Sequence, residues 1–135
     1  MKLWITDNGN PDHKAVLLEV VGERIPVEES PEGLKITLVM DGSIGPEESY
    51  RIDGSGNAFT VTGTDKLGLY YGIGKLLHTA AWTGESFTPK GTSGVISPDC
   101  PYRAIYFCTH FYNWYNLAPV EELEKYARDL LDDLL

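Results

Sequence analysis

The chain has 135 residues, of which 42% are hydrophobic and 23% charged, so it is long and apolar enough for one packed domain and unlike a disordered chain. Its formal net charge is −9 and no Lys/Arg cluster interrupts the acidic surplus. This balance argues against nucleic acid and against anionic membranes, because both require a basic surface. A neutral ligand such as a sugar meets no such obstacle.

The cysteine, metal and targeting signals are sparse. Cys100 and Cys108 are too few for a disulfide scaffold, and no His or Cys spacing is typical of a metal site, so we expect neither metal nor cofactor. No stretch approaches the roughly 18 apolar residues of a membrane span. The N-terminus lacks the apolar run of a signal peptide. We therefore expect a cytoplasmic protein, or a secreted or periplasmic one whose signal has been removed.

The first part of the chain predicts a strand, a helix and two further strands. Residues 2–7 read as a strand, and Asp12 is expected to cap a helix over residues 13–23. Residues 24–29 contain a proline that cannot donate to a ladder, which favours a short edge strand. Residues 34–41 alternate apolar and polar side chains, so Leu34, Ile36, Leu38 and Met40 are expected on one buried face.

The middle of the chain predicts a hairpin and a buried helix. Residues 49–52 and 58–62 read as two antiparallel strands, since the residues between them tolerate positive φ. Thr64 or Asp65 is expected to cap a helix over residues 66–82 that is apolar around nearly its whole circumference. Its glycines lower helix propensity, and we interpret them as allowing close approach to a sheet. They are Gly68, Gly72 and Gly74.

The last part predicts a loop over residues 83–101, a strand over 102–108 and an amphipathic helix over 119–135. Pro119 suits the first position of that helix. Its apolar stripe has no later partner in the chain, which indicates the opening of a larger β/α array. The stripe comprises Val120, Leu123, Tyr126, Ala127, Leu130, Leu131 and Leu134.

These elements predict an α+β fold that is followed by a partial β/α unit. We expect residues 1–97 to form one α/β domain and residues 98–135 to begin the next unit.

The candidate functional segment is residues 102–115, in which seven of fourteen side chains are aromatic. Apolar walls with a few placed polar groups are typical of ligand pockets, although a core strand with an aromatic-packed loop would look the same. The Cys108–His110 pair lacks a third group, so we predict no catalytic residue. The predicted substrate-binding residues are Arg103, His110, Asn113 and Trp114.

Four short motifs between residues 48 and 111 carry a family resemblance. They are an E-x-Y pattern at 48–50, a TG-x-D turn at 62–65, a G-x-x-Y-G helix core at 68–72 and the run PDCPYR at 98–103. In this order they resemble the accessory domain of glycoside hydrolase family 20, the β-N-acetylhexosaminidases, and the segment that leads into their first barrel strand. The chain is identified as a divergent member.

The resemblance implies a zincin-like accessory fold without zinc, in which a mixed β-sheet carries two helices on one face. Residues 1–97 would form this accessory α/β domain, and residues 98–135 would be the first strand and helix of a truncated barrel. The resemblance also implies that Arg103 binds hydroxyls of the sugar at the cleavage subsite. The family's catalytic Asp–Glu pair lies at the end of barrel strand 4, which this chain does not contain. Ala104 stands where the family has Gly, and residues 108–112 replace a D-x-x-R-H run. Alpha-glucuronidases share a similar front domain and stay open as the parent class.

Three functions follow as hypotheses. The first is a non-catalytic domain that supports the barrel of a hexosaminidase-like glycoside hydrolase, with the missing catalytic barrel and a carbohydrate as partners. The second is a free-standing carbohydrate-binding module. The third is an interaction domain that forms homo-oligomers through residues 119–135.

Overall fold

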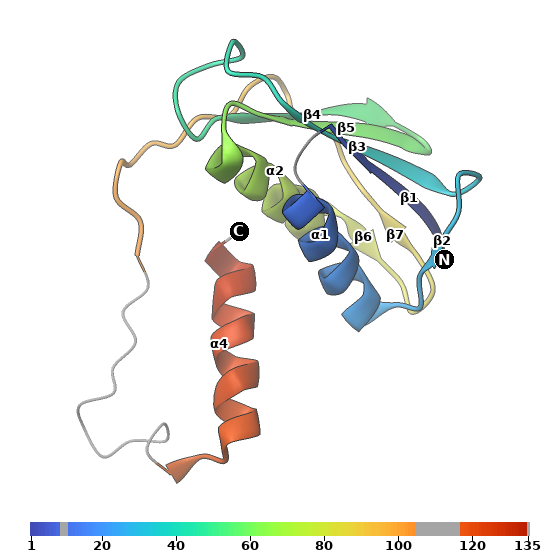
Figure 1. Ribbon diagram of the computed structural model, residues 1–135, viewed down its shortest axis with the longest axis vertical. Coiled ribbons are helices and arrows are strands. Elements are labelled where there is room, and N and C mark those ends of the chain that lie inside the picture. Colours follow the sequence, from blue (N-terminus) through green and yellow to red (C-terminus); the bar gives the residue numbers. More distant parts are fainter. Residues whose placement is uncertain (9–10, 105–116, 135) are drawn as a thin grey trace.

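The computed structural model describes residues 1–8, 11–104 and 117–134, with the backbone alone for residues 130–134. Five strands form one sheet in the order β2-β1-β3-β5-β4, in which β4 is antiparallel to β5 and all other neighbours are parallel. Helices α1 and α2 lie on the same face of this sheet (Figure 1). The mixed sheet with its helices confirms the predicted α+β class. The elements are β1 (Lys2–Asp7), α1 (Pro11–Arg24), β2 (Glu28–Glu29), β3 (Leu34–Met40), β4 (Tyr50–Ser55), β5 (Ala58–Gly63), α2 (Lys66–Thr79), β6 (Ala81–Trp82), β7 (Phe87–Thr88) and α4 (Val120–Leu134).

The hydrophobic core lies between the sheet and helices α1 and α2. Strand alternation sends every second side chain of β1 and β3 toward the helices, so Leu34, Ile36 and Leu38 are buried as predicted. Met40 does not share their burial and is 42% exposed, because it ends the strand at the rim of the sheet. Burying one such aliphatic side chain stabilises the fold by roughly 1.5–3 kcal/mol. The fully buried core side chains include Leu3, Leu17, Val21, Ile36, Leu38, Ile52, Val61, Ile73 and Leu76.

Two glycines bring α2 unusually close to the sheet. A Cβ added at Gly68 would lie 2.4 Å from the carbonyl oxygen of Ser49, and one added at Gly72 would lie 2.6 Å from Cγ1 of Val61. Both distances are shorter than real Cβ contacts, so a side chain at either position would force the helix away from β4 and β5. The predicted close approach is confirmed at these two glycines, and Gly74 is buried in the same helix.

Helix α2 ends at Thr79, so the prediction that it continues to residue 82 is wrong. Ala80 takes an extended backbone with φ −67° and ψ 149°. The Trp82 indole donates to the carbonyl oxygen of Leu77 at 3.0 Å, and its ring lies 4.7 Å from that of Phe87. These tertiary contacts draw Ala81–Trp82 into β6, which pairs with β7. The predicted loop over 83–101 therefore contains a strand, and its residue Ile96 forms a bridge with Tyr50.

Other boundaries also shift. Helix α1 begins at Pro11, so Asp12 lies inside the first turn instead of preceding the helix as its cap. Because α1 continues to Arg24, the predicted edge strand over 24–29 shrinks to the two residues of β2. Pro119 lies just before α4, where its carbonyl oxygen accepts hydrogen bonds from the amides of the helix's first turn, instead of taking the first helical position.

Ion pairs link the described residues after position 97 to the rest of the fold. Residues 102–104 form no strand, and the remainder of the strand predicted over 102–108 lies outside the described residues. Arg128 of α4 lies 2.8 Å from Glu19 and 3.1 Å from Glu23 of α1, and α4 also contacts α2. Val120, which begins the predicted apolar stripe, is 64% exposed.

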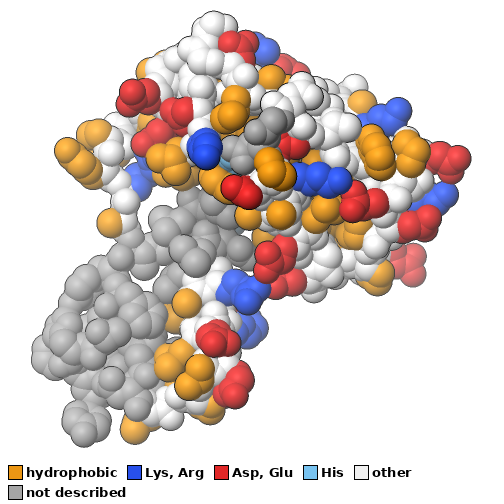
Figure 2. Space-filling view, viewed as in Figure 1, with side chains coloured by type: hydrophobic (Ala, Val, Ile, Leu, Met, Phe, Trp, Pro, Cys, Tyr) orange, Lys and Arg blue, Asp and Glu red, His pale blue; other side chains and the backbone are white. Residues whose placement is uncertain are grey.

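Acidic and basic side chains alternate over the face shown in Figure 2, and no large basic patch interrupts them. This mixture agrees with the net charge of −9. Among the helices that the structure describes, none combines the length and apolarity needed to cross a membrane.

Candidate functional site

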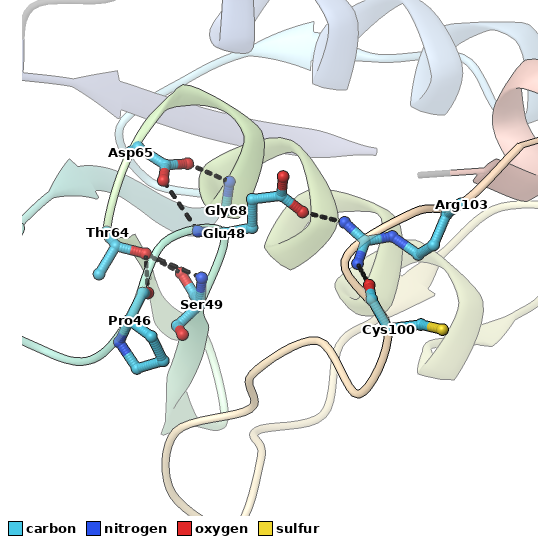
Figure 3. Close-up of polar contacts among 8 residues, drawn as sticks. All are labelled: Pro46, Glu48, Ser49, Thr64, Asp65, Gly68, Cys100 and Arg103. Atoms are coloured by element: carbon cyan, nitrogen blue, oxygen red, sulfur yellow. Dashed lines mark hydrogen bonds and ion pairs between the residues drawn. The ribbon is translucent and has the colours of Figure 1, made fainter.

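A polar network joins the loop before β4 to the start of α2 (Figure 3). Asp65 caps α2, because its Oδ1 accepts a hydrogen bond from the Gly68 amide at 2.8 Å. Its Oδ2 accepts a second hydrogen bond, from the Glu48 amide at 2.8 Å. Of the two caps expected from the sequence, the structure therefore selects Asp65, and the same carboxylate holds the backbone of Glu48.

Thr64, the other candidate cap, ties the same loop together. Its hydroxyl accepts from the Ser49 amide at 2.8 Å and lies 3.0 Å from the carbonyl oxygen of Pro46 and 2.9 Å from that of Ser49. A hydroxyl carries one proton, so it donates to one of these two carbonyl groups at a time. The Ser49 hydroxyl in turn lies 2.9 Å from that of Ser97, which fixes the later segment beside the loop.

This network aims the Glu48 side chain at Arg103, which belongs to the segment after residue 97. The carboxylate of Glu48 accepts a hydrogen bond from Nη2 of Arg103, and Nη1 donates to the carbonyl oxygen of Cys100 at 3.0 Å. The guanidinium also lies over Tyr71, 4.5 Å from the ring centroid. The contacts of the guanidinium, first with Tyr71 and then with Glu48, raise the pKa of Arg103, so the guanidinium stays charged.

A groove of about 470 Å³ runs between α2 and residues 96–103. Its lining includes the aromatic rings of Tyr50 and Tyr71 and the polar groups of Lys75, His78, Asp99 and Arg103. Hydrogen-bond donors and acceptors are both present. The carboxylates of Glu48 and Asp99 offset the positive charges of Lys75 and Arg103. The volume lies within the roughly 300–1,000 Å³ of small-molecule sites. A neutral, hydroxyl-rich molecule matches this lining better than a strongly charged one.

The predicted site residues divide into two groups. Arg103 lies at the groove, where it meets Glu48 and Tyr71. The other three predicted residues, His110, Asn113 and Trp114, lie outside the described residues, as do Cys108 and its neighbours. In the part of the chain that the structure describes, no three His, Cys, Asp or Glu side chains are grouped to hold a metal ion.

Sequence reasoning assigned no role to Glu48 or Tyr71, although both stand inside the motifs at 48–50 and 68–72. The motif pattern was the signal that could have pointed to these two residues. The pairing of Glu48 with Arg103 could be seen only in the fold, because the two lie 55 positions apart in the sequence.

No protein-family model matches the chain, and no curated protein matches it. Among solved structures, it is similar to a glycoside hydrolase family 20 β-N-acetylglucosaminidase, with a TM-score of 0.48 and 29% identity over 67% of this chain and 16% of that one. It is also similar to the Flavobacterium johnsoniae chitobiase, with a TM-score of 0.44 and 23% identity over 67% of this chain and 16% of that one. A family 138 glycoside hydrolase that targets pectin rhamnogalacturonan II gives a TM-score of 0.46 and 20% identity over 56% of this chain and 13% of that one. The chain thus spans a small share of each of these proteins.

Proposed function

We propose that this chain is a non-catalytic, zincin-like domain of a hexosaminidase-like glycoside hydrolase. Residues 1–97 would form the accessory domain that supports a catalytic barrel, and residues 98–135 would open that barrel. Arg103 would contribute a contact to the hydroxyls of the bound sugar. The catalytic carboxylates would come from elsewhere in the barrel.

One observation carries this proposal: the motifs that resemble the family meet at a single place in the fold. Glu48 of the E-x-Y pattern, Asp65 of the TG-x-D turn and Gly68 of the helix core are joined by hydrogen bonds. Arg103 of the PDCPYR run reaches the same cluster through Glu48. Segments that are separated in sequence but contiguous in space form one unit, which supports a shared role for them.

The test compares enzymes made from the complete natural reading frame. The wild type is expected to hydrolyse an aryl-β-N-acetylglucosaminide, whereas the 135-residue chain alone should give no turnover. Arg103→Ala should lower kcat/KM roughly 30-fold or more, because a charged hydrogen bond to the sugar is lost. Lys90→Ala, at an exposed position away from the groove, is the control. Hydrolysis by the 135-residue chain, or no hydrolysis of any aryl-glycoside by the complete protein, would overturn the proposal.

A second candidate, a free-standing carbohydrate-binding module, is favoured by the composition of the groove. Tyr50 and Tyr71 offer aromatic faces, and Asp99 and Arg103 offer an acceptor and a donor. On this alternative the isolated chain should bind a saccharide with millimolar or tighter affinity, measured by calorimetry. Arg103→Ala should abolish the binding heat. No saccharide binding at millimolar concentration would eliminate this candidate.

A further inference from the structure

The backbone of Glu48 is the strained point of the candidate site. Its φ of 61° lies in the left-handed region, and it is the only described non-glycine residue with a positive φ. An L side chain in this region is strained, and glycine would avoid most of that strain. The loop therefore holds a glutamate where its backbone favours glycine.

The contacts of Glu48 show what its strained backbone holds in place. The Asp65 carboxylate fixes the Glu48 amide at 2.8 Å, so the direction of the side chain is set by the cap of α2. The carboxylate then meets the edge of the Arg103 guanidinium, whose face lies over Tyr71. Arg103 is thus held between one acidic and one aromatic group, and both belong to the residues before 97.

We propose that Glu48 is a positioning residue which, together with Tyr71, fixes the guanidinium of Arg103 in one orientation at the groove. This inference rests on the proposed function only for what Arg103 binds; the positioning itself is a property of the isolated chain. It assigns the first 97 residues a specific task, which is to preorganise an arginine that lies beyond them in the sequence. Preorganised donors bind a ligand at lower entropic cost than mobile ones.

The two contacts are complementary in what they restrict. The carboxylate bond sets the in-plane direction of the guanidinium and uses one of its five donor hydrogens, while the Cys100 carbonyl group uses another. The Tyr71 ring restricts rotation out of that plane. Donors remain to serve a ligand, and the side chain of Arg103 is 31% exposed toward solvent.

The first test is limited proteolysis of the whole chain with trypsin, followed by mass spectrometry of the cut after Arg103. Trypsin must bind the arginine side chain, so a guanidinium held by Glu48 and Tyr71 slows this cut. Glu48→Gln and Glu48→Gly are each expected to speed it about threefold to tenfold relative to the cut after exposed Lys90. Glu47→Gln, at the exposed neighbouring position, should leave the ratio unchanged.

The glycine variant separates positioning from folding. Because glycine relieves the left-handed backbone, Glu48→Gly should unfold at the same or a higher denaturant concentration than the wild type while the cut after Arg103 becomes faster. If Glu48 stabilised the fold without positioning Arg103, the stability of the chain and the protection of Arg103 from trypsin would change together. Equal cleavage ratios in the wild type, Glu48→Gln and Glu48→Gly would overturn the proposal.

Nuclear magnetic resonance tests the contact between Arg103 and Glu48 directly. In Glu48→Gln, the side-chain N–H resonances of Arg103 should move relative to the wild type, because the charged acceptor of Nη2 is lost. Tyr71→Leu should move the same resonances, because it removes the ring current, whereas Tyr102→Leu, at a side chain 90% exposed, should not. Arg103 resonances that ignore both Glu48→Gln and Tyr71→Leu would overturn the positioning. A complete protein that lacks glycosidase activity would overturn only the proposed function.

Discussion

Helices α2 and α4 have almost the same length, 14 and 15 residues, but they are held in different ways. Helix α2 is capped by Asp65 and approaches the sheet closely at Gly68 and Gly72. Helix α4 begins with an exposed Val120 and is linked to α1 through Arg128. The difference indicates that α2 is part of the folded body. The described contacts of α4 with that body are the ion pairs of Arg128 and its approach to α2.

The largest expected effect comes from filling the space beneath α2. In Gly68→Ala, the new methyl group would lie 2.4 Å from the Ser49 carbonyl oxygen, so backbone must move. We expect the free energy of unfolding to fall by about 3 kcal/mol, measured by urea denaturation. Gly22→Ala in α1 is the control, since nothing lies within 4 Å of its added Cβ. That variant should be neutral or more stable by up to about 1 kcal/mol.

Removing the cap should have the next largest effect. Asp65→Ala deprives the amides of Gly68 and Glu48 of their acceptor, and we expect a loss of about 2 kcal/mol in unfolding free energy. Asp65→Asn keeps an acceptor oxygen and should recover at least half of that loss. If the alanine variant were as stable as the wild type, the network at the start of α2 would not hold the helix.

Alkaline pH should lower the unfolding free energy when the Tyr50 hydroxyl loses its proton. Burial raises the pKa of the Tyr50 hydroxyl above its ordinary value of 10.0, so the folded state favours the neutral form. This contribution to stability is complete below pH about 10 and is lost as the pH rises through the folded-state pKa. Urea denaturation from pH 9 to about 11.5 should show a steeper loss for the wild type than for Tyr50→Phe. Tyr102→Phe, at an exposed position, should follow the wild type.

The smallest effect is expected where α4 meets α1. Arg128 is about half exposed, as are Glu19 and Glu23, so these ion pairs are screened by solvent. Arg128→Ala should change the unfolding free energy by less than about 0.5 kcal/mol. A loss above about 2 kcal/mol would mean that α4 belongs to the cooperative core, contrary to the contrast with α2.

The sequence predicted those parts of the fold that depend on local pattern. The alternation in β3 and the glycines of α2 each produced the expected packing. The end of α2 was missed because the contacts of Trp82 with Leu77 and Phe87 override a helical pattern. No local signal reports such a contact before the chain is folded.

The candidate site was predictable only in part, and for the same reason. Arg103 was predicted because it stands in a recognisable motif. Its partners Glu48 and Tyr71 come from a loop and a helix that the fold brings to it, so spacing in the sequence could not pair them. The positive φ of Glu48 is likewise a consequence of the assembled loop and not of the residue type.

Hydrogen exchange of the whole chain at neutral pH tests most directly whether the molecule is a folded body with an attached helix. Amides of β3, β5 and α2 should exchange only through global unfolding, and those of α4 should exchange at least about a hundredfold faster, because a 15-residue helix is marginal alone. Protection of α4 equal to that of α2 would contradict this account.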